Sequence, residues 1–531
     1  MPHPVESFSP EEQARLAPHF SNLDRPVFAL VGLPETVKGA LFARYSRYGG
    51  TLRRLFLDEF ADSLPAGAGE AAAASSEVEG ERAAQLYERI FLGYGDDSVA
   101  QLGGAHVACE WVSNVLTKVL QRPRLASYLE QSTRYIAYDA PVPGGGYRYF
   151  RDPSLGAEYE QAMDALFDTY AGCLPRVRAW VDDAFPGDPS PARDRAVQAK
   201  ALDLLRGLLP AASLSHMGIY ASGQAYEQLI LHLLAHPLPE ARAYGRMVLE
   251  AVQAVMPSFV ARVERPDRGG DWVSFLQERD AAAGRWVQRL GLDREAGAGD
   301  DRPSVKLLHV DGDEEGLLAA LLFEASGVSE ETARIRLAAL SGDERLALLR
   351  DLVGERRNRR HRPGRGFESV RYRFEVVSDY GAFRDLQRHR MLTVQWQQLG
   401  PHLGAGVPDE VDAAGCGDDF RRALEVSRGA WQRLADGGRS REALYALCLG
   451  YRIRYVLDLN AREAMQLIEL RSGREGHPSY RAVAHEMHRQ ISAVHPAIGA
   501  AMTHVDTEAE PRLERILSEM RTQAKRDALA R

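Results

Sequence analysis

Short apolar runs and stretches of helical periodicity alternate along the chain, and its two halves open in the same way. Apolar runs at Val27 to Val31 and at Val305 to Val310 predict strands. Each run is followed by a loop and then by apolar residues at helical spacing, at Thr36 to Tyr45 in the first half and at Glu315 to Glu324 in the second. The shared opening suggests that the two halves are related.

Most of the remaining chain has helical spacing. Apolar positions at Ala225 to Leu234, Ala243 to Val255 and Ala461 to Leu470 predict helices, whereas Phe367 to Val377 alternates in the manner of a strand. The pattern therefore predicts an α+β fold in which helices dominate.

A five-residue segment occurs once in each half. Leu120 to Arg124 and Leu386 to Arg390 differ only in that Pro123 of the first stands where the second has His389. Together with the matching openings, this repeat favours an internal duplication. A stretch rich in Gly and Asp, from about Gly291 to Glu315, is the best boundary between the copies. We therefore expect domains at residues 1–290 and 316–531, joined by 291–315. A second loop, rich in Ala, Gly, Ser and Glu, is expected at 64–81.

Composition narrows the class of protein. The 531 residues are 45% hydrophobic and 26% charged, which is typical of a globular protein, and the net charge of −8 argues against a general polyanion binder. The four cysteines form no C-x-x-C pair, and no stretch approaches the length of a membrane span. Met1 to Arg25 contains no apolar core of the signal-peptide type, and the sequence has no P-loop, G-x-G-x-x-G turn or H-E-x-x-H motif. These features predict a cytoplasmic protein with neither a membrane segment nor a metal site.

The first half has one segment, between Arg122 and Tyr135, that is rich in residues able to bind a ligand. It combines arginines, which match phosphate oxygens, with Ser127, Ser132 and the carboxylate of Glu130, which can orient a ribose or a base. The alternative is a solvated polar loop with one surface ion pair.

The second half has two such segments. Arg388, His389 and Arg390 would suit a large, planar, anionic ligand, although an exposed basic turn explains them as well. The basic run from Arg356 to Arg365 could bind nucleic acid, but it is short and has no interleaved aromatics, so a phosphate-facing loop or solvated turn is favoured. Asn460, at the start of a predicted helix that reaches Arg471, suits a helix N-cap.

These motifs resemble those of the flavin-dependent thymidylate synthases, the ThyX family, whose signature is R-H-R-x-x-S-x-N-E-x-S-x-R-Y. The first half matches the signature from Arg122 to Tyr135, with Pro123 for the histidine and Leu129 for the asparagine. The second half keeps Arg388, His389 and Arg390 and then departs from the signature. Gly95 to Ser98 resembles the family's G-H-x-[ST] segment without its histidine.

The C-terminal motifs of the family are also divided between the halves. Arg206 of the first half matches the family's early arginine, where the second half has Leu444. The N-x-R and L-R motifs survive only in the second half, as Asn460 with Arg462 and as Leu470 with Arg471. Such complementary losses favour a fused pair of subunits that keeps one composite site out of two.

The resemblance implies a fold, an activity and a set of site residues. It implies two tandem ThyX-like domains, helix-rich with a mixed or antiparallel sheet, forming an intramolecular pseudo-dimer, and a homodimer of the chain equivalent to the family's homotetramer. The implied reaction converts dUMP to dTMP, with FAD as cofactor and NADPH and methylenetetrahydrofolate as co-substrates. The residues it assigns to dUMP are Glu130, Ser132, Arg134, Arg206 and Arg471, of which Arg134 and Arg471 are the catalytic candidates. Those it assigns to FAD are Ser98, Glu368, Arg388, His389, Arg390, Asn460 and Arg462.

Two other functions fit the sequence. The chain could be a degenerate relative that binds flavin or nucleotide without making dTMP, or that acts on another pyrimidine nucleotide. It could also be a helical scaffold that uses the basic run from Arg356 to Arg365 to bind nucleic acid. The expected partners under the leading interpretation are dUMP and folate, with no nucleic acid and no membrane.

Overall fold

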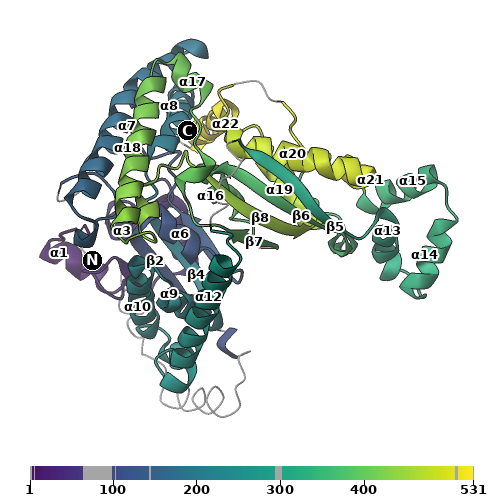
Figure 1. Cartoon of the computed structure of the whole chain (residues 1–531), viewed down its shortest axis with the longest axis horizontal. Helices are drawn as coiled ribbons and strands as arrows, with labels where there is room; N and C mark the ends of the chain where they lie inside the picture. The colour runs from purple at the N-terminus through teal and green to yellow at the C-terminus, as the bar shows by residue number, and fades with distance from the viewer. Residues whose placement is uncertain are drawn as a thin grey trace. The chain divides into compact units, whose positions relative to one another are not determined.

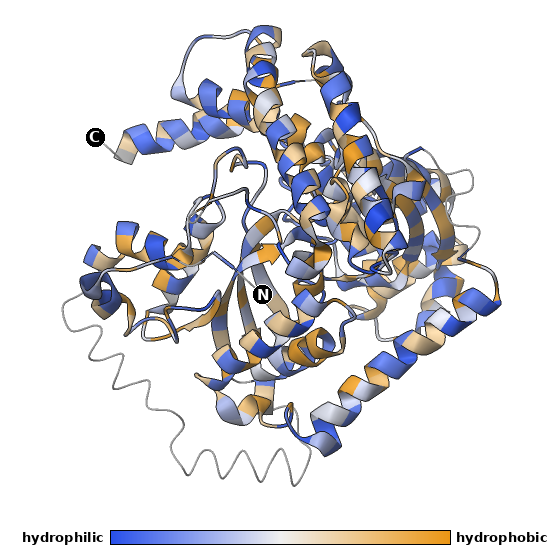
Figure 2. Ribbon diagram, turned by 60° about the vertical axis from the view of Figure 1, so that its left-hand side comes forward, coloured by the Kyte–Doolittle hydropathy of each residue, from blue (hydrophilic) through white to orange (hydrophobic). Residues whose placement is uncertain are grey.

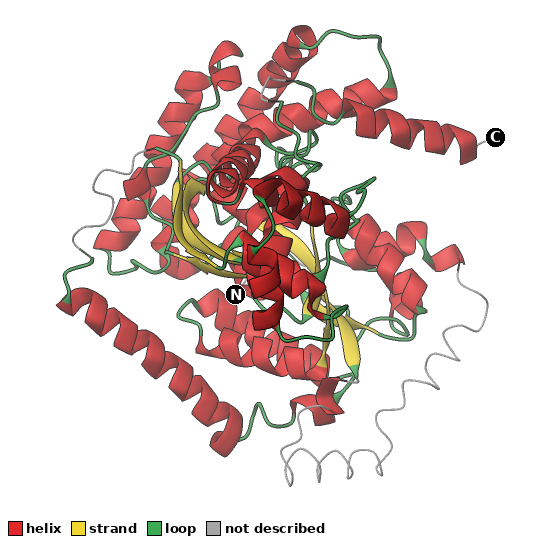
Figure 3. Cartoon of the chain, turned by 90° about the vertical axis from the view of Figure 1, so that its right-hand side faces the viewer, coloured by secondary structure: helices red, strands yellow, loops and turns green. Residues whose placement is uncertain are grey.

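The computed structural model describes residues 3–4, 6–63, 99–101, 103–142, 145–293, 302–508 and 512–529. The loop expected at 64–81, Ser98, and the central part of the expected linker lie outside the described residues. Helices make up most of the described chain, around two groups of strands (Figure 3).

The chain forms two compact units, each assembled from segments that are separated in the sequence. Unit 1 comprises Met1–Cys173, Leu208–Ala296 and Asp419–Cys448. Unit 2 comprises Leu174–Gly207, Gly297–Asp418 and Leu449–Arg531. Each unit therefore contains residues from both halves of the sequence. The division at residues 290 and 315 remains a prediction about the two copies.

Unit 1 contains a four-stranded antiparallel sheet with the order β1-β2-β4-β3. Its long central strands pair from Gly104 with Ser222 to Ser113 with Leu214, and a one-residue irregularity interrupts them between Cys109 and Val112. The strands are β1 (Val27–Leu30), β2 (Gly104–Ser113), β3 (Ala126–Glu130) and β4 (Leu214–Ser222).

Unit 2 repeats this topology, with the order β5-β6-β8-β7 and antiparallel pairing throughout. Its strands are β5 (Ser304–Asp311), β6 (Arg371–Asp379), β7 (Leu392–Trp396) and β8 (Arg452–Asn460). The two equivalent sheets confirm the predicted α+β fold. The strand expected from Phe367 begins later, because 365–369 forms a short 3₁₀ turn, η7 (Arg365–Ser369), that buries Phe367.

Each central strand runs directly into a helix, and a polar side chain at the junction caps that helix. Ser113, Ser222, Asp379 and Asn460 each accept a hydrogen bond from the backbone N–H three residues later. Such a cap satisfies a backbone donor that has no partner within the helix. The helices that follow are α6 (Asn114–Leu120), α9 (Gly223–Ala235), α16 (Tyr380–Leu386) and α19 (Ala461–Arg471). The predicted N-cap role of Asn460 is thus confirmed.

The repeated five-residue segment occupies the same place in both units. Leu120 and Leu386 each end the short helix after a central strand, and Gln121 and Gln387 are the respective C-caps. The rest of each segment leads into the edge strand of its sheet, β3 in unit 1 and β7 in unit 2. Figure 1 labels α16 and β7, between which the second segment lies. The structural equivalence supports the interpretation of this repeat as a duplication.

Helices cover the sheet of each unit. In unit 1, α10 (Pro239–Gln253) contacts β1 and β2 and packs on α9, and in unit 2, α20 (Pro478–Val494) contacts β5 and β6 and packs on α19. Apolar residues lie along the strands and on the helix faces that meet them (Figure 2). Besides α6, the helices described before β4 are α1 (Pro10–Leu16), α2 (Glu35–Tyr45), α3 (Leu52–Glu59), α7 (Ala157–Ala184) and α8 (Pro191–Leu205). The others are α11 (Pro257–Val260), α12 (Asp271–Arg289), α13 (Glu314–Phe323), α14 (Glu330–Ala338), α15 (Gly342–Val353), α17 (Asp409–Ala413), α18 (Gly417–Asp436), α21 (Pro496–Ala501) and α22 (Ile516–Leu529).

A membrane-spanning helix would need a long, almost uncharged apolar stretch. Within the described ranges, none of the helices meets that requirement.

Candidate active site

His389 is held between a carboxylate and a guanidinium in unit 2. Its Nδ1 lies 2.9 Å from Oε1 of Glu463, and its Nε2 lies 3.1 Å from Nε of Arg471. The side chains of His389 and Glu463 are 4% and 5% exposed, so water does not compete for this contact. The resulting chain of three polar groups runs from the start of α19 to its last residue.

The partners of His389 determine where its proton lies. A guanidinium can only donate, so Nε2 must accept from Arg471. The proton of the neutral imidazole is therefore on Nδ1, which donates to Glu463. Burial lowers the pKa of His389, and the positive charge of Arg471 lowers it further, against the opposing effect of Glu463. The ring is thus neutral at pH 7.

Local sequence fixes both sides of this contact. Asn460 caps α19 by accepting from the backbone N–H of Glu463 at 2.9 Å, which places Glu463 in the first turn of the helix. On the other side, α16 ends at Leu386, and the following residues turn the chain toward β7. His389 is buried there, whereas Arg388 and Arg390 on either side of it are exposed.

Arg206, from the first half of the sequence, belongs to the same unit. Its Nη1 donates to Oδ2 of Asp385 at 3.2 Å, and its Nη2 lies 3.8 Å from Oδ1 of Asp379. Asp385 also lies 3.9 Å from Nη1 of Arg388. The guanidinium of Arg206 is 4% exposed, and its Nη2 makes no hydrogen bond. Unit 2 therefore brings Arg206 together with the arginine-rich segment of the second half.

Glu368 and Arg462, both assigned to FAD by the resemblance, lie side by side. Nη1 of Arg462 is 3.5 Å from Oε1 of Glu368, and its Nε donates to the carbonyl of Pro363 at 3.0 Å. Glu368 also accepts from Arg365. Both side chains of the pair are about a quarter exposed, so a ligand could reach them.

The candidates of the first half that remain in unit 1 have structural partners. Oε2 of Glu130 accepts from Nζ of Lys118 and from Nε2 of Gln121, both at 3.0 Å, and the two charged side chains are 1% exposed. The hydroxyl of Ser132 accepts from the backbone N–H of Arg134 at 3.2 Å. Arg134 is 9% exposed. The motif thus includes strand β3 and buries Glu130 and Arg134, whereas Arg122, Arg124 and Ser127 are exposed.

The basic run from Arg356 to Arg365 has one buried member. The guanidinium of Arg356 pairs with Glu469 through two hydrogen bonds of 2.5 and 2.6 Å, and these side chains are 3% and 0% exposed. Arg357, by contrast, is exposed and pairs with Glu355. The first residue of the run therefore has a structural role.

Glu463, Asp385 and Lys118 join the candidate residues although the sequence motifs did not single them out. Glu463 was recognisable only as the third residue after a helix N-cap. Asp385 and Lys118 carry no motif, and their roles depend on partners that are close only in the folded chain.

Comparison with known proteins places the chain among relatives of similar length. It is 36% identical to a UPF0159 protein of Chlamydia muridarum over 97% of this chain and 99% of the relative. A UPF0159 protein of Chlamydia pneumoniae is also 36% identical, over 97% and 98% of the respective chains. One of Thermoplasma acidophilum is 30% identical over 92% of this chain and 99% of the relative.

Among solved structures, a UMP/dUMP methylase from Streptomyces cacaoi bound with 5-Br dUMP matches 39% of this chain and 98% of its own. The sequence identity is 21% and the TM-score is 0.31. The family model for thymidylate synthase complementing protein matches this chain twice, at residues 58–258 and 317–497. Those two regions cover more than half of the chain, one in each half of the sequence, and agree with the two equivalent sheets. The chain therefore belongs to the thymidylate synthase complementing protein (ThyX) family, as a tandem pair of copies.

Proposed function

We propose that this protein is a flavin-dependent thymidylate synthase that converts dUMP to dTMP, with methylenetetrahydrofolate as carbon donor and NADPH as reductant. Family membership supports the class of reaction. The observation that carries the assignment to this chain is the contact of Glu463, His389 and Arg471 in unit 2. It joins the R-H-R motif to the L-R motif, two of the family elements that only the second half retains.

The residues of unit 2 fit a flavin dinucleotide. Such a ligand carries a pyrophosphate and a planar ring, which call for hydrogen-bond donors and positive charge. Arg388 and Arg390 are exposed beside buried His389. Glu368 and Arg462 would hold the remainder of the cofactor once their mutual ion pair opened to it. When bound, the flavin would supply the redox chemistry of the reaction.

Arg471 has the clearest catalytic role in this proposal. Its Nε is held by His389, which fixes the plane of the guanidinium. An arginine so oriented can donate to a carbonyl of the pyrimidine and stabilise the negative charge that develops on the ring as C5 becomes nucleophilic. Because His389 is neutral, it orients the guanidinium without adding a second positive charge.

The other residues assigned to dUMP would bind rather than react. Arg134 of unit 1 would neutralise the phosphate, and Ser132 would donate to one of its oxygens. Arg206, in unit 2, is likewise assigned to dUMP by the resemblance, and its buried Nη2 can donate a hydrogen bond. Glu130 would orient the ribose or the base. This last assignment requires that Glu130 keep an acceptor for the ligand while it accepts from Lys118 and Gln121.

The partners of Glu130 favour a second candidate function. A carboxylate that is 1% exposed and already paired with Lys118 suits a structural role better than a contact with substrate. A ThyX relative in which Glu130 is structural could bind nucleotide and flavin without the synthase reaction. Turnover, rather than binding, separates these two functions.

Binding experiments on single variants test the assigned residues. Arg134→Ala should abolish dUMP binding and leave the bound flavin unchanged, whereas His389→Ala should lower the flavin content of the purified protein. Arg489→Ala is the matched control, because Arg489 is exposed on α20 and pairs with Glu486 on the same helix. Tight dUMP binding by Arg134→Ala, or full flavin content in His389→Ala, would overturn the corresponding assignment.

A further inference from the structure

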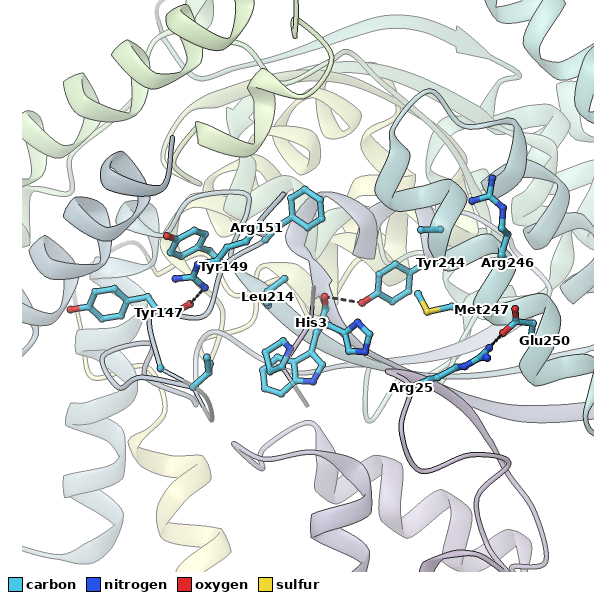
Figure 4. Close-up of a pocket in the computed structure, with 16 residues that line it drawn as sticks. His3, Arg25, Tyr147, Tyr149, Arg151, Leu214, Tyr244, Arg246, Met247 and Glu250 are labelled. Carbon is cyan, nitrogen blue, oxygen red and sulfur yellow. Dashed lines mark hydrogen bonds and ion pairs between the residues drawn. The ribbon is translucent and has the colours of Figure 1, made fainter. Parts of the chain in front are cut away.

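A cavity in unit 1 is lined by aromatic rings and arginines that none of the family motifs includes. It has a volume of about 750 Å³, which lies within the range of roughly 300–1,000 Å³ for small-molecule sites. Its lining includes the aromatic residues Trp111, Tyr147, Tyr149, Phe150 and Tyr244. Figure 4 shows the rings of Tyr147, Tyr149 and Tyr244. Such rings can stack on a planar ligand.

The charged groups of this cavity favour an anion. Arg25, Arg151 and Arg246 line it together with the carboxylate of Glu250. Arg151 also lies 3.8 Å from Oδ1 of Asp164, so the three arginines exceed these two carboxylates by one positive charge. Arg25 forms an ion pair with Glu250. Arg151 lies over the ring of Tyr149, with its guanidinium carbon 3.8 Å from the ring centre, and donates to the carbonyl of Tyr147 at 2.8 Å. Arg246 is exposed on α10, where it is available to a ligand.

A strained backbone presents Trp111 to the cavity. Among the residues that the structure describes, Trp111 is the one non-glycine residue with a positive φ, at 56°. Cys109 pairs with Met217, and Val112 pairs with Ser215. Two residues of β2 therefore lie between these pairs but only one residue of β4, so β2 has one extra residue there and forms a β-bulge. Residues other than glycine in this conformation cost about 1–3 kcal/mol and gather at ligand sites.

The surrounding residues maintain this strain. The backbone N–H of Trp111 donates to Nδ1 of the buried His216 at 3.1 Å. The hydroxyl of Tyr244 lies 2.6 Å from the carbonyl of Glu110 and 2.9 Å from that of Trp111. The equivalent strands of unit 2, β6 and β8, pair from end to end without a shift in register. The bulge is therefore specific to one copy, which indicates that it serves something other than the shared fold.

We propose that this cavity binds a small planar aromatic ligand that carries an anionic group. The ring packs against Trp111 and Tyr244, which are neighbours in the cavity wall, and Arg246 neutralises the anion. Adenosine 5′-monophosphate has both features and serves as the probe. Adenosine supplies the ring without the anion, and inorganic phosphate supplies the anion without the ring.

Calorimetric titration of the full chain tests the proposal in the presence of saturating dUMP, which keeps any dUMP site occupied. AMP should bind, and adenosine and phosphate should each bind at least about tenfold more weakly. Arg246→Ala should weaken AMP about tenfold and leave adenosine unchanged, because it removes one charged hydrogen bond from an exposed position. Arg285→Ala, an exposed arginine on α12 that does not line the cavity, is the control and should change neither.

A second variant fills the space instead of removing charge. Ala243→Trp places a large ring in the cavity wall and should abolish the binding of both AMP and adenosine, with circular dichroism confirming that the variant folds. The proposal is overturned if AMP does not bind, if phosphate alone binds as tightly as AMP, or if neither Arg246→Ala nor folded Ala243→Trp changes AMP affinity. Because no turnover is measured, these outcomes are independent of the synthase proposal.

Discussion

Replacing Glu463 tests whether its carboxylate holds His389 in place. Glu463→Gln keeps an oxygen that can accept from Nδ1–H of His389, whereas Glu463→Met keeps the approximate shape and helix propensity but has no such acceptor. In the native protein this contact is 2.9 Å long, and both side chains are about 95% buried. The two variants therefore differ mainly in whether a buried donor has a partner.

The expected cost follows from that difference. A hydrogen bond to a charged group contributes about 1.5–3 kcal/mol, and a buried donor without a partner costs about 1–3 kcal/mol. Because these two figures describe the same loss, we expect Glu463→Met to lower the free energy of unfolding by about 2–3 kcal/mol. Glu463→Gln should lower the free energy of unfolding by about 1 kcal/mol, because this variant keeps the hydrogen bond and loses only the negative charge. Both variants keep Asn460 as the cap of α19, because that cap uses the backbone of residue 463.

Urea unfolding, followed by far-ultraviolet circular dichroism, measures the effect. Flavin content of the same samples shows whether the displaced imidazole also disturbs the ligand. The reasoning is refuted if Glu463→Met is as stable as Glu463→Gln, because the carboxylate would then contribute nothing through His389.

Three further predictions concern stability. Arg356→Ala should lower the free energy of unfolding in urea by about 3–5 kcal/mol, because it leaves buried Glu469 unpaired. The control Arg357→Ala should lower it by less than about 0.5 kcal/mol. Equal losses in the two variants would refute the structural role of Arg356. Asn460→Ala should cost about 1 kcal/mol and Asn460→Asp much less, since aspartate also caps, and a reversed order would refute the cap. Burial lowers the pKa of His389 and, with Arg122 nearby, lowers the pKa of His236 to about 4. The unfolded chain, with histidine pKa values near 6.5, therefore binds protons that the folded chain does not, so stability should fall between about pH 6.5 and pH 4; a flat urea midpoint over that range would contradict this.

Much of the fold followed from local patterns. The apolar runs at Val27 and Val305 became β1 and β5, and the helical spacing after each became α2 and α13. The repeated five-residue segment took equivalent positions in the two sheets because local sequence decides how a strand enters a helix and leaves it. The start of β6 was placed too early, because buried Phe367 in a 3₁₀ turn gives the same apolar signal as a strand residue.

Unit 2 contains a segment from the first half of the sequence, Leu174–Gly207, and periodicity could not predict this. Arg206 lies 179 positions from Asp385, and Lys200, also from the first half, forms a buried ion pair with Glu514 in unit 2 at 2.7 Å. Such contacts depend on how the chain returns on itself, about which the local pattern carries no information. The resemblance identified Arg206 as a site residue but not the carboxylates that surround it.

In the candidate site, too, contacts between residues close in the sequence could be predicted, whereas contacts between distant residues could not. Asn460 could be read as a cap because the cap and its helix are adjacent in the sequence. That Glu463 and Arg471 meet His389 could not be deduced from spacing, since 74 and 82 positions separate them from the histidine. Motifs named two of these three residues, and only the folded chain supplied the third.

The most direct test of the proposed function follows the release of tritium from dUMP labelled at C5, in the presence of FAD, NADPH and methylenetetrahydrofolate. The account predicts release that requires both FAD and the folate, that is abolished by Arg471→Ala, and that persists in Arg489→Ala. Absence of release from wild-type protein that binds dUMP and carries flavin would contradict the account and would identify a ThyX relative that binds the nucleotide without performing the synthase reaction.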